Sequence, residues 1–392
     1  MGKIDDLIQQ YCPDGVEYVK LGDVVSISRG ASPRPIQNYL TDEEDGIPWI
    51  KIGDVSTNSK YITATNERIT REGANKSRFL KKGTFILSNS MSFGRPYILG
   101  IDGCIHDGWI SICDFEASLN SDFLYYLLRS SDVQGYWISK ANSGGAVSNL
   151  NSDIVKSTPI PLPPLPVQEE IVRILDNFTN LAAELQAELQ AELQARQQQY
   201  QYYRDTLLSF EGREDVKWMK LGDVCDIRRG IRVVKKQLND NGDYPVFQNS
   251  IPPMGYYDQY NREGNMPYVI CAGSSSGSIG YCSSPFWAAD DCFTVEGVQV
   301  NNRYVFHTLK KNNHKLFSQV RNGSMPRLPH DAIDNLIIPI PSLEEQEKIA
   351  TILDRFDTLT NDLSQGLPAE IEARQQQYEY YRDQLLTFKR KA

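Results

Sequence analysis

Three short motifs carry residue types that could do chemistry, and each lacks a part that the chemistry requires. An amino-methyltransferase needs Asn, Asp or Ser before Pro-Pro and an aromatic residue after it, but residues 251–254 read Ile-Pro-Pro-Met. A metal-dependent nuclease needs clustered acids and a lysine on paired strands, whereas Asp215-Val216-Lys217 lies in a linker without an upstream acidic partner. Residues 277–280 lack the third glycine of a dinucleotide-binding turn, and no Walker lysine loop occurs. The sequence therefore predicts a protein without a catalytic site.

The cysteines and histidines do not form a metal-binding or disulfide pattern. Seven cysteines are scattered without a Cys-x-x-Cys pair, and the chain has four histidines. Cys104-x-His106 is the nearest approach to a ligand pair, and small residues in a strand and loop are its simpler interpretation. We expect neither a disulfide framework nor a structural zinc site.

Length and charge favour a multidomain protein that could still bind nucleic acid. At 392 residues the chain exceeds one ordinary hydrophobic core. No apolar run approaches the roughly 18 residues of a membrane span, and the first residues lack the order of a secretory signal, so we expect a cytoplasmic protein without membrane contact. The net charge of −9 is uneven: residues 161–216 hold 4 basic and 10 acidic residues, whereas residues 217–340 hold 14 and 11. The regions outside the acidic segments can therefore present basic faces.

Two internal repeats organise the chain. Lys20-Leu-Gly-Asp-Val24 returns as Lys220-Leu-Gly-Asp-Val224, and each copy is followed by Arg-Gly, at 29–30 and 229–230. A second repeat at a different spacing relates residues 168–210 to residues 346–388, including a shared Tyr-Tyr-Arg-Asp-x-Leu-Leu-x-Phe ending. Between these matches, residues 31–150 and 231–330 share little sequence. The order is variable, constant, variable, constant, which predicts a pseudo-twofold internal repeat.

The constant segments have the pattern of long helices. Residues 168–210 contain no Pro or Gly, follow a proline-rich entry at 159–166, and would extend roughly 65 Å as one helix. An apolar stripe at spacings of three and four runs through it: Ile171, Ile174, Leu175, Phe178, Leu181, Leu185, Leu189 and Leu193. We expect it to pair with the matching stripe Ile349, Ile352, Leu353, Phe356, Leu359 and Leu363 of an antiparallel second helix. Residues 366–368, Gly-Leu-Pro, predict an interruption with Pro368 in the first turn of a restarted helix.

The predicted fold class is α+β: two globular mixed α/β recognition domains separated by two long antiparallel helices that form a coiled coil. Short Val/Ile/Tyr-rich runs at 48–52, 84–87, 110–113 and 268–271 predict strands, and 122–129 and 303–310 predict helices. The expected organisation is an N-terminal segment (1–18), a first module (19–160), a proline-rich entry and central helix (161–216), a second module (217–340) and a C-terminal helix (341–392).

Together these motifs resemble the specificity subunit of type I restriction-modification systems, the HsdS family. The resemblance spans nearly the whole chain and lies in the paired module starts, the Ile-Pro-x-Pro exits at 160–163 and 338–341, the Gln-Glu-x-Ile helix openings and the repeated closing motif. Residues 183–194 also hold three tandem Ala-Glu-Leu-Gln units, similar to the short spacer repeats of that family. Each unit would add about 6 Å of helix.

The resemblance implies a DNA reader without a catalytic site. Each module would be a target recognition domain that reads one half of a bipartite site in double-stranded DNA, while the helices set the spacing and dock two adenine methyltransferase subunits. S-adenosylmethionine would be bound by those partners and not by this chain, and restriction/translocase subunits would join in the full complex.

Loop residues able to pair with base edges are the candidates for DNA contact, although phosphate contact is the commoner role of such residues. In the first module they are Arg29, Arg34, Lys51, Ser88, Asn89, Ser90, Arg95, Asn142, Ser143 and Asn149. In the second they are Arg229, Arg232, Lys235, Lys236, Gln248, Asn249, Ser274, Ser275, Arg321, Asn322 and Arg327.

The repeated aromatic ends of the helices are candidates for partner binding, and packing of the helix pair is an equally good interpretation. These residues are Tyr200, Tyr203, Leu207 and Phe210, with their copies Tyr378, Tyr381, Leu385 and Phe388. A coiled-coil adaptor whose globular ends bind proteins is the alternative function. A self-contained methyltransferase or nuclease has less support, because the motifs it needs are incomplete.

Overall fold

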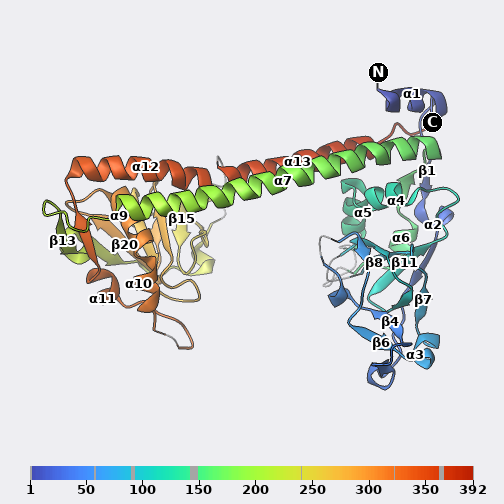
Figure 1. Ribbon diagram of the computed structural model, residues 1–392, viewed down its shortest axis with the longest axis horizontal. Helices are drawn as coiled ribbons and strands as arrows, with labels where there is room; N and C mark the ends of the chain where they lie inside the picture. The colour runs from blue at the N-terminus through green and yellow to red at the C-terminus, as the bar shows by residue number, and fades with distance from the viewer. Residues whose placement is uncertain are drawn as a thin grey trace. The chain divides into compact units, whose positions relative to one another are not determined.

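The computed structural model describes residues 2–56, 59–89, 93–141, 149–239, 241–321, 323–361 and 366–391, and it divides into two compact units. Unit 1 comprises residues 1–186 and 373–392, and unit 2 comprises residues 187–372. Each unit therefore contains one variable module together with a stretch of each constant helix (Figure 1). Across these ranges, every helix is too short or too polar to cross a membrane.

Unit 1 builds its module from two five-stranded sheets and a two-stranded ribbon. The sheet orders are β2-β11-β8-β9-β5 and β3-β6-β4-β10-β7, and the ribbon pairs β1 with β12. The strands are β1 (Tyr18–Lys20), β2 (Ser26–Arg29), β3 (Leu40–Thr41), β4 (Ile47–Ile50), β5 (Tyr61–Ile62), β6 (Glu67–Ile69), β7 (Arg78–Leu80), β8 (Phe85–Ser88), β9 (Pro96–Leu99), β10 (Gly103–Ile105), β11 (Trp109–Cys113) and β12 (Pro159–Pro161). The helices are α1 (Lys3–Tyr11), α2 (Leu21–Val24), α3 (Arg71–Asn75), α4 (Ser121–Leu128), α5 (Ser131–Ala141) and α6 (Ser152–Lys156).

Unit 2 repeats this plan with fewer strands. Its sheets are β14-β20-β17-β18 and β16-β15-β19, and its ribbon pairs β13 with β21. The strands are β13 (Lys217–Lys220), β14 (Cys225–Arg229), β15 (Tyr244–Phe247), β16 (Gly255–Tyr257), β17 (Met266–Ile270), β18 (Ile279–Cys282), β19 (Trp287–Ala288), β20 (Cys292–Gly297) and β21 (Ile337–Ile340). The helices are α8 (Leu221–Val224), α9 (Asn302–Lys311), α10 (Asn313–Ser318) and α11 (His330–Asp334).

The two modules share a topology that their sequences hide. In unit 1, β11 lies antiparallel between β2 and β8, and β10 pairs in parallel with β4. In unit 2, β20 lies antiparallel between β14 and β17, and β19 pairs in parallel with β15. Residues 31–150 and 231–330 are therefore two versions of one domain, and positions within them can be compared through backbone hydrogen bonds.

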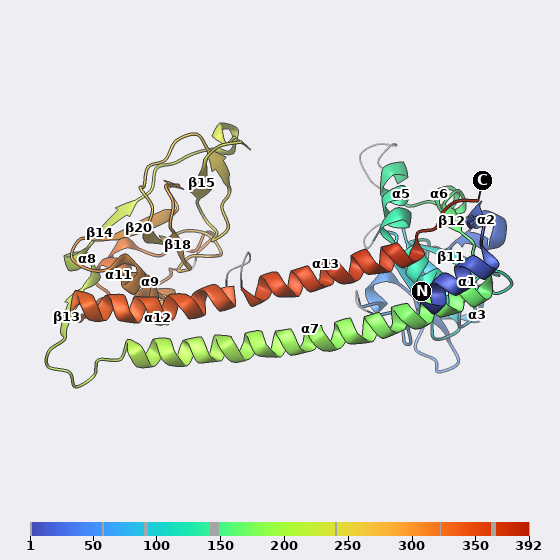
Figure 2. The same cartoon turned by 90° about the horizontal axis from the view of Figure 1, so that it is seen from above.

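The constant segments form the predicted helices. Helix α7 (Leu165–Leu207) is unbroken over 43 residues, and Figure 2 shows it as one ribbon. It begins before Gln168 because Pro166 fits the first turn, where its missing N–H would have had no helical acceptor. The second constant segment is divided into α12 (Leu343–Asn361) and α13 (Leu367–Leu386), which confirms the interruption expected at Gly366 and Pro368.

The apolar stripes do not meet in the way the sequence suggested. In unit 1 the start of α7 lies against the end of α13, with Phe178 and Tyr381 rings 6.3 Å apart. In unit 2 the end of α7 lies against α12, where Tyr203 and Phe356 rings stack at 5.2 Å. The expectation that Ile171 and its stripe pair with the copy at 349–363 was wrong, because antiparallel helices place the start of one against the end of the other.

A buried glutamine joins each module to the opening of its helix. The Gln168 side chain accepts a hydrogen bond from the Asn120 backbone N–H at 2.8 Å and donates to the Pro163 carbonyl at 2.7 Å. Asn120 in turn caps α4. Unit 2 repeats the arrangement, since Gln346 accepts from the Asn301 N–H at 2.9 Å and donates to the carbonyl of Pro341. The Gln-Glu helix opening is thus a structural joint.

A second polar contact ties each module to the helix pair, and here the two units differ. In unit 1 the Tyr126 hydroxyl, on α4, donates to Asp176 at 2.7 Å. In unit 2 the equivalent position on α9 is His307, whose Nε2 lies 2.6 Å from the Asp354 carboxylate, and α9 lies beside α12 in Figure 1. Nε2–H donates to this carboxylate, so Nδ1 accepts from the Tyr200 hydroxyl at 3.0 Å.

All seven cysteines are free thiols, and six are buried. Burial raises the pKa of Cys104 to about 11 and that of Cys225 to about 12. Cys113 is only partly buried, but desolvation also raises its pKa. These thiols pack as small apolar residues.

Candidate nucleic-acid interface

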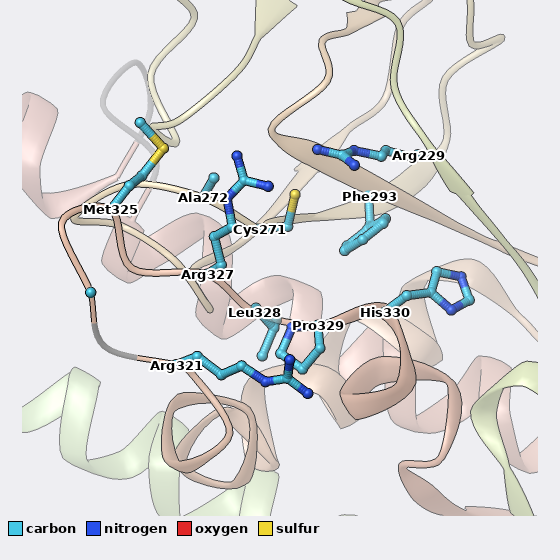
Figure 3. Close-up of a pocket in the computed structure, with 11 residues that line it drawn as sticks. Arg229, Cys271, Ala272, Phe293, Arg321, Met325, Arg327, Leu328, Pro329 and His330 are labelled. Atoms are coloured by element: carbon cyan, nitrogen blue, oxygen red, sulfur yellow. The ribbon is translucent and has the colours of Figure 1, made fainter.

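The second module brings three of its predicted DNA-contacting arginines into one pocket. Arg229, Arg321 and Arg327 line a cavity of about 530 Å³ together with His330. Phe293 and Leu328 form apolar parts of its wall, and Figure 3 shows the guanidinium groups of Arg229 and Arg327 on the same side of it. The pocket joins residues that are about 100 positions apart in the chain.

Arg229 is held in place at the end of β14. Its Nε donates to the Asp290 backbone carbonyl at 2.7 Å, and its own carbonyl accepts a hydrogen bond from the Arg262 guanidinium at 3.2 Å. The next residue must be glycine, since a Cβ at Gly230 would lie 2.1 Å from the Ala289 carbonyl oxygen. A Cβ at Gly30 would likewise lie 2.0 Å from the His106 carbonyl oxygen, which explains why a glycine follows the arginine in both modules.

Arg321 and Arg327 face each other across a short bridge. The Arg321 N–H donates to the Arg327 carbonyl at 2.8 Å, and the Arg327 N–H donates back at 3.1 Å. Arg327 also forms a β-bridge with Ala272. Its backbone is therefore fixed on both sides, although Arg327 itself is exposed.

The pocket is cationic as well as partly apolar. The eleven described residues that line it include three arginines and a histidine and no acid. Burial raises the pKa of the Cys271 thiol to about 11, while Arg229 and Arg327 each act to lower it, which places both positive charges near that sulfur. A site of this kind favours an anionic or electron-rich ligand.

Other candidates of the second module lie elsewhere on its surface. Arg232, Lys235 and Lys236 are exposed, as are Asn249 and Ser274, and Ser275 is half-buried. The Gln248 amide donates to Asp291 at 3.2 Å, so part of its hydrogen-bonding capacity is used within the protein. Asn322 lies outside the described residues.

In the first module the candidate cluster is built around one aspartate. Arg29 Nε donates to the Asp107 backbone carbonyl at 2.9 Å, and the Asn89 side chain donates to the same oxygen at 3.3 Å. The Asp107 carboxylate accepts from Ser32 and pairs with Arg34 at 3.2 Å. The Ser32 hydroxyl, more than Arg34, lowers the pKa of Asp107. This cluster therefore includes a carboxylate, whereas no acid is among the described residues that line the pocket of the second module, although Asp290 and Asp291 lie next to it.

Several remaining candidates of the first module are not available as predicted. Ser88 is fully buried within β8 and cannot reach DNA, so that prediction was wrong. It failed because a strand end and a loop start look alike in sequence. Lys51 pairs with Glu67, and burial raises the pKa of Tyr97, which the positive charge of Arg95 acts to lower. Asn149 is exposed, while Ser90, Asn142 and Ser143 lie outside the described residues.

The aromatic ends of the helices divide into packing and exposed residues. Tyr200 and Phe210 are 7% and 2% exposed and pack inside unit 2, which supports the packing interpretation for both. Tyr203 and Tyr381 are exposed. The other four residues of that set, Leu207, Tyr378, Leu385 and Phe388, are half-buried.

Sequence reasoning missed the most exposed aromatic residues of the constant helices. Tyr202 is 67% exposed and Tyr380 is 60% exposed, and they occupy the same position in the two copies of the repeat. Their place in the closing motif was the available signal. His330 of the arginine pocket was also missed, because only residue types typical of base readout were considered.

No cluster of three or more metal-binding side chains occurs among the described residues.

Comparison with known proteins gives one consistent result. The family model for the type I restriction modification DNA specificity domain matches residues 13–195 and again residues 213–373. A putative type I restriction enzyme specificity subunit of Haemophilus influenzae is 31% identical over 399 residues, covering 95% of this chain and 96% of the relative. The EcoR124I/EcoR124II specificity subunit of Escherichia coli is 32% identical over 410 residues, covering 90% and 97%.

Solved structures show the same fold at lower identity. A chain from a study of complex assembly and conformational transition in a type I restriction-modification system aligns with a TM-score of 0.70 at 18% identity, covering 95% of this chain and 97% of that one. The HsdS subunit of Thermoanaerobacter tengcongensis aligns with a TM-score of 0.53 at 17% identity, covering 96% of each chain.

Proposed function

The chain belongs to the family of type I restriction-modification DNA specificity subunits, and on that premise we propose that each module reads one half of a bipartite site in duplex DNA. The chain is the non-catalytic subunit that gives such an enzyme its DNA sequence specificity. One observation carries the proposal: the same fold occurs twice, and each copy is tied to the helices by an equivalent buried glutamine. Two different modules on one repeated scaffold suit a site with two different halves.

The arginine pocket supports the second module as a DNA-contacting surface. Guanidinium groups bind phosphate oxygens and base edges, and a concave cationic site concentrates such contacts. We propose the same role for the corresponding loops of the first module. The module limits 19–160 and 217–340 remain a prediction from the sequence. DNA as the partner implies that the chain acts in the cytoplasm.

We further propose that the exposed tyrosine pairs dock two adenine methyltransferase subunits. Tyr202 and Tyr203 in unit 2 correspond to Tyr380 and Tyr381 in unit 1, so two identical partners would meet equivalent surfaces. Exposed aromatic residues are enriched at protein interfaces. The partners would bring S-adenosylmethionine, and restriction/translocase subunits would complete the full enzyme.

Stoichiometry tests the docking proposal. Replacement of Tyr202 and Tyr203 by Ala should reduce the bound methyltransferase from two copies to one, measured by native mass spectrometry of the reconstituted complex. The matched double variant at Tyr380 and Tyr381 should have the same effect in unit 1, and replacement of Tyr256, an exposed tyrosine of the second module, by Ala should retain two copies. Retention of two copies by both double variants would exclude these surfaces.

The Ala-Glu-Leu-Gln units allow a test of the proposal that the two modules read the two halves of one DNA site. Deletion of one Ala-Glu-Leu-Gln unit removes about 6 Å of helix, which compares with 3.4 Å per base pair, so the preferred gap should shorten by about one or two base pairs. Mapping of adenine methylation in DNA exposed to the complex reports both half-sites and the gap. An unchanged gap would argue against the helices as spacers, whereas methylation without any sequence preference would argue against the proposed function itself.

A further inference from the structure

Backbone hydrogen bonds show that one residue of the first module occupies the same position in the fold as one pocket residue of the second module. In the first module the Asn89 N–H donates to the Gly108 carbonyl at 3.1 Å, and the Asn89 carbonyl accepts from the Leu150 N–H at 2.8 Å. The strand end is thereby paired on both sides. Asn149, directly before Leu150, is exposed at this point.

The second module has the same two hydrogen bonds with different side chains. The Cys271 N–H donates to the Asp291 carbonyl at 2.8 Å, and the Cys271 carbonyl accepts from the Leu328 N–H at 2.9 Å. Arg327 directly precedes Leu328. It therefore occupies the structural position that Asn149 has in the first module.

A second pair of positions carries the same residue in both modules. Arg29 and Arg229 each end the first strand of their sheet, and each donates from Nε to a backbone carbonyl, of Asp107 at 2.9 Å and of Asp290 at 2.7 Å. A residue that is unchanged between two modules of different sequence suits a contact that every DNA site offers. The sugar-phosphate backbone offers such a contact, and base edges do not.

The position that differs is built for a directional contact. The Arg327 backbone is fixed by its bridges to Arg321 and Ala272, and among the described residues its guanidinium takes part in no ion pair. Phe293, which is 6% exposed, forms an apolar part of the wall of the same pocket (Figure 3). A guanidinium carried on a fixed backbone at the edge of a partly apolar pocket can present two parallel donors to one base.

We propose that Arg327 and Asn149 are equivalent base-reading residues with different targets, guanine for Arg327 and adenine for Asn149, and that Arg29 and Arg229 hold phosphates. An arginine fork matches the O6 and N7 acceptors of guanine, and an asparagine amide matches the N6 donor and N7 acceptor of adenine. This inference rests on the proposed function, because it assigns chemistry to residues of the same DNA-contacting loops. It predicts that one half-site contains a guanine and that the other half-site contains an adenine at the equivalent position.

The test compares variants in the complete complex with its methyltransferase subunits. Genomic DNA lacking adenine methylation is treated with each complex, and the methylated sites are mapped. Arg327→Gln should change one position in one half-site, with discrimination for guanine falling roughly 5- to 150-fold and preference moving toward adenine. Asn149→Ala should relax one position in the other half-site.

Phosphate-contact variants should behave differently. Arg229→Gln should leave the recognised sequence unchanged and lower the extent of methylation at all sites alike, and it should reduce the salt dependence of DNA binding by about one phosphate contact. Arg228→Gln is the matched control on the same strand, since Arg228 is paired with Asp226, and it should match the parent complex.

Three results would overturn the inference while leaving the proposed function intact. They are an unchanged sequence preference in Arg327→Gln, a parent site without guanine in the half that this variant affects, and a change at a single base position in Arg229→Gln. A parent complex that methylates adenines without sequence preference would instead overturn both the inference and the proposed function.

Discussion

The two joints between module and helix pair use the same backbone positions for different chemistry. In unit 1 Tyr126 meets Asp176 through a neutral hydroxyl, next to the Thr179 and Tyr378 hydroxyls. In unit 2 a fully buried imidazole, His307, meets a carboxylate that is also paired with a guanidinium. The scaffold therefore fixes where a module attaches, while the side chains at the joint can change from neutral to ionic. This difference makes the two units unequal in their response to mutation and to pH.

The largest expected effect tests the backbone fold that the two modules share. Gly30→Ala would place a Cβ 2.0 Å from the His106 carbonyl oxygen, and Gly230→Ala would place one 2.1 Å from that of Ala289. Each change should lower the free energy of unfolding by at least ~3 kcal/mol, because backbone must move. Urea denaturation followed by circular dichroism measures the loss.

Gly53→Ala is the control for this pair, because no atom lies within 4 Å of the added Cβ. It should change the unfolding free energy by less than ~0.5 kcal/mol. A severe loss in Gly30→Ala with none in Gly230→Ala would contradict a common backbone fold.

The next effect tests the difference between the joints. Asp354→Ala leaves buried His307 and partly buried Arg303 without their shared carboxylate, and we expect a loss of about 2–3 kcal/mol. Asp176→Ala removes one hydrogen bond from a neutral hydroxyl and should cost about 1 kcal/mol. Hydrogen exchange of the amides in α9 and α4 separates the two local losses. Equal losses would show that the ionic contact in unit 2 stabilises its joint no more than the neutral hydrogen bond stabilises that of unit 1.

A smaller effect distinguishes the helix openings. Glu170, 4% exposed, accepts from Arg173 and from Lys3 of α1, and its pKa is lowered to about 2 by these hydrogen bonds, Arg173 first. Lys348 has the same repeat position in α12, but it is exposed and pairs only with Glu344 among the described residues. Glu170→Ala should lose about 1–2 kcal/mol. Lys348→Ala should leave the unfolding curve unchanged. A comparable loss of unfolding free energy in Lys348→Ala would show that the contact of Glu170 with α1 does not account for the difference between the two helix openings.

The smallest effect is a pH dependence of the His307 joint in unit 2, which the Tyr126 joint of unit 1 should not share. Burial lowers the pKa of His307 below its ordinary value of 6.5, although Asp354 acts to raise it. The unfolded chain therefore binds a proton that folded His307 does not, so stability should fall as the pH drops below about 6.5. The slope is at most about 1.4 kcal/mol per pH unit for one group. Arg303, Asp357 and Tyr200 also face this site.

Local hydrogen exchange between pH 7 and pH 5 measures this dependence. Protection of the α9 amides should decrease as the pH falls from 7 to 5, whereas protection of the α4 amides should not. His307→Gln should remove this difference. Equal pH dependence in α4 and α9 would contradict the assignment to His307.

Much of the scaffold could be predicted because its signals are local. The unbroken run without Gly or Pro predicted α7, and the strand and helix segments lie within a few residues of their predicted places. The repeat predicted two units of one plan. The direction of helix pairing was predicted, but the partners were wrong, because an antiparallel pair places the start of α7 against the end of α13 and not against the matching stripe of α12.

The site was predicted only in part, since it depends on distant contacts. Residue type selected Arg229, Arg321 and Arg327 as candidates, but their meeting in one pocket needed strand pairing between segments about 100 residues apart. The equivalence of Asn149 and Arg327 is invisible in sequence, because the surrounding residues do not match. Ser88 and Tyr200 show the reverse case, in which a polar or aromatic residue of a suitable type is buried.

The sheltered thiols make the protein convenient for spectroscopy. Their raised pKa values keep the thiolate fraction small at neutral pH, so native cysteines should react slowly with maleimides. Cysteines introduced at Gly53 and Ser274, both exposed and one in each unit, could then carry a fluorophore pair without prior removal of native residues. Energy transfer between the dyes would report, in solution, how far apart the two modules are for each number of Ala-Glu-Leu-Gln units.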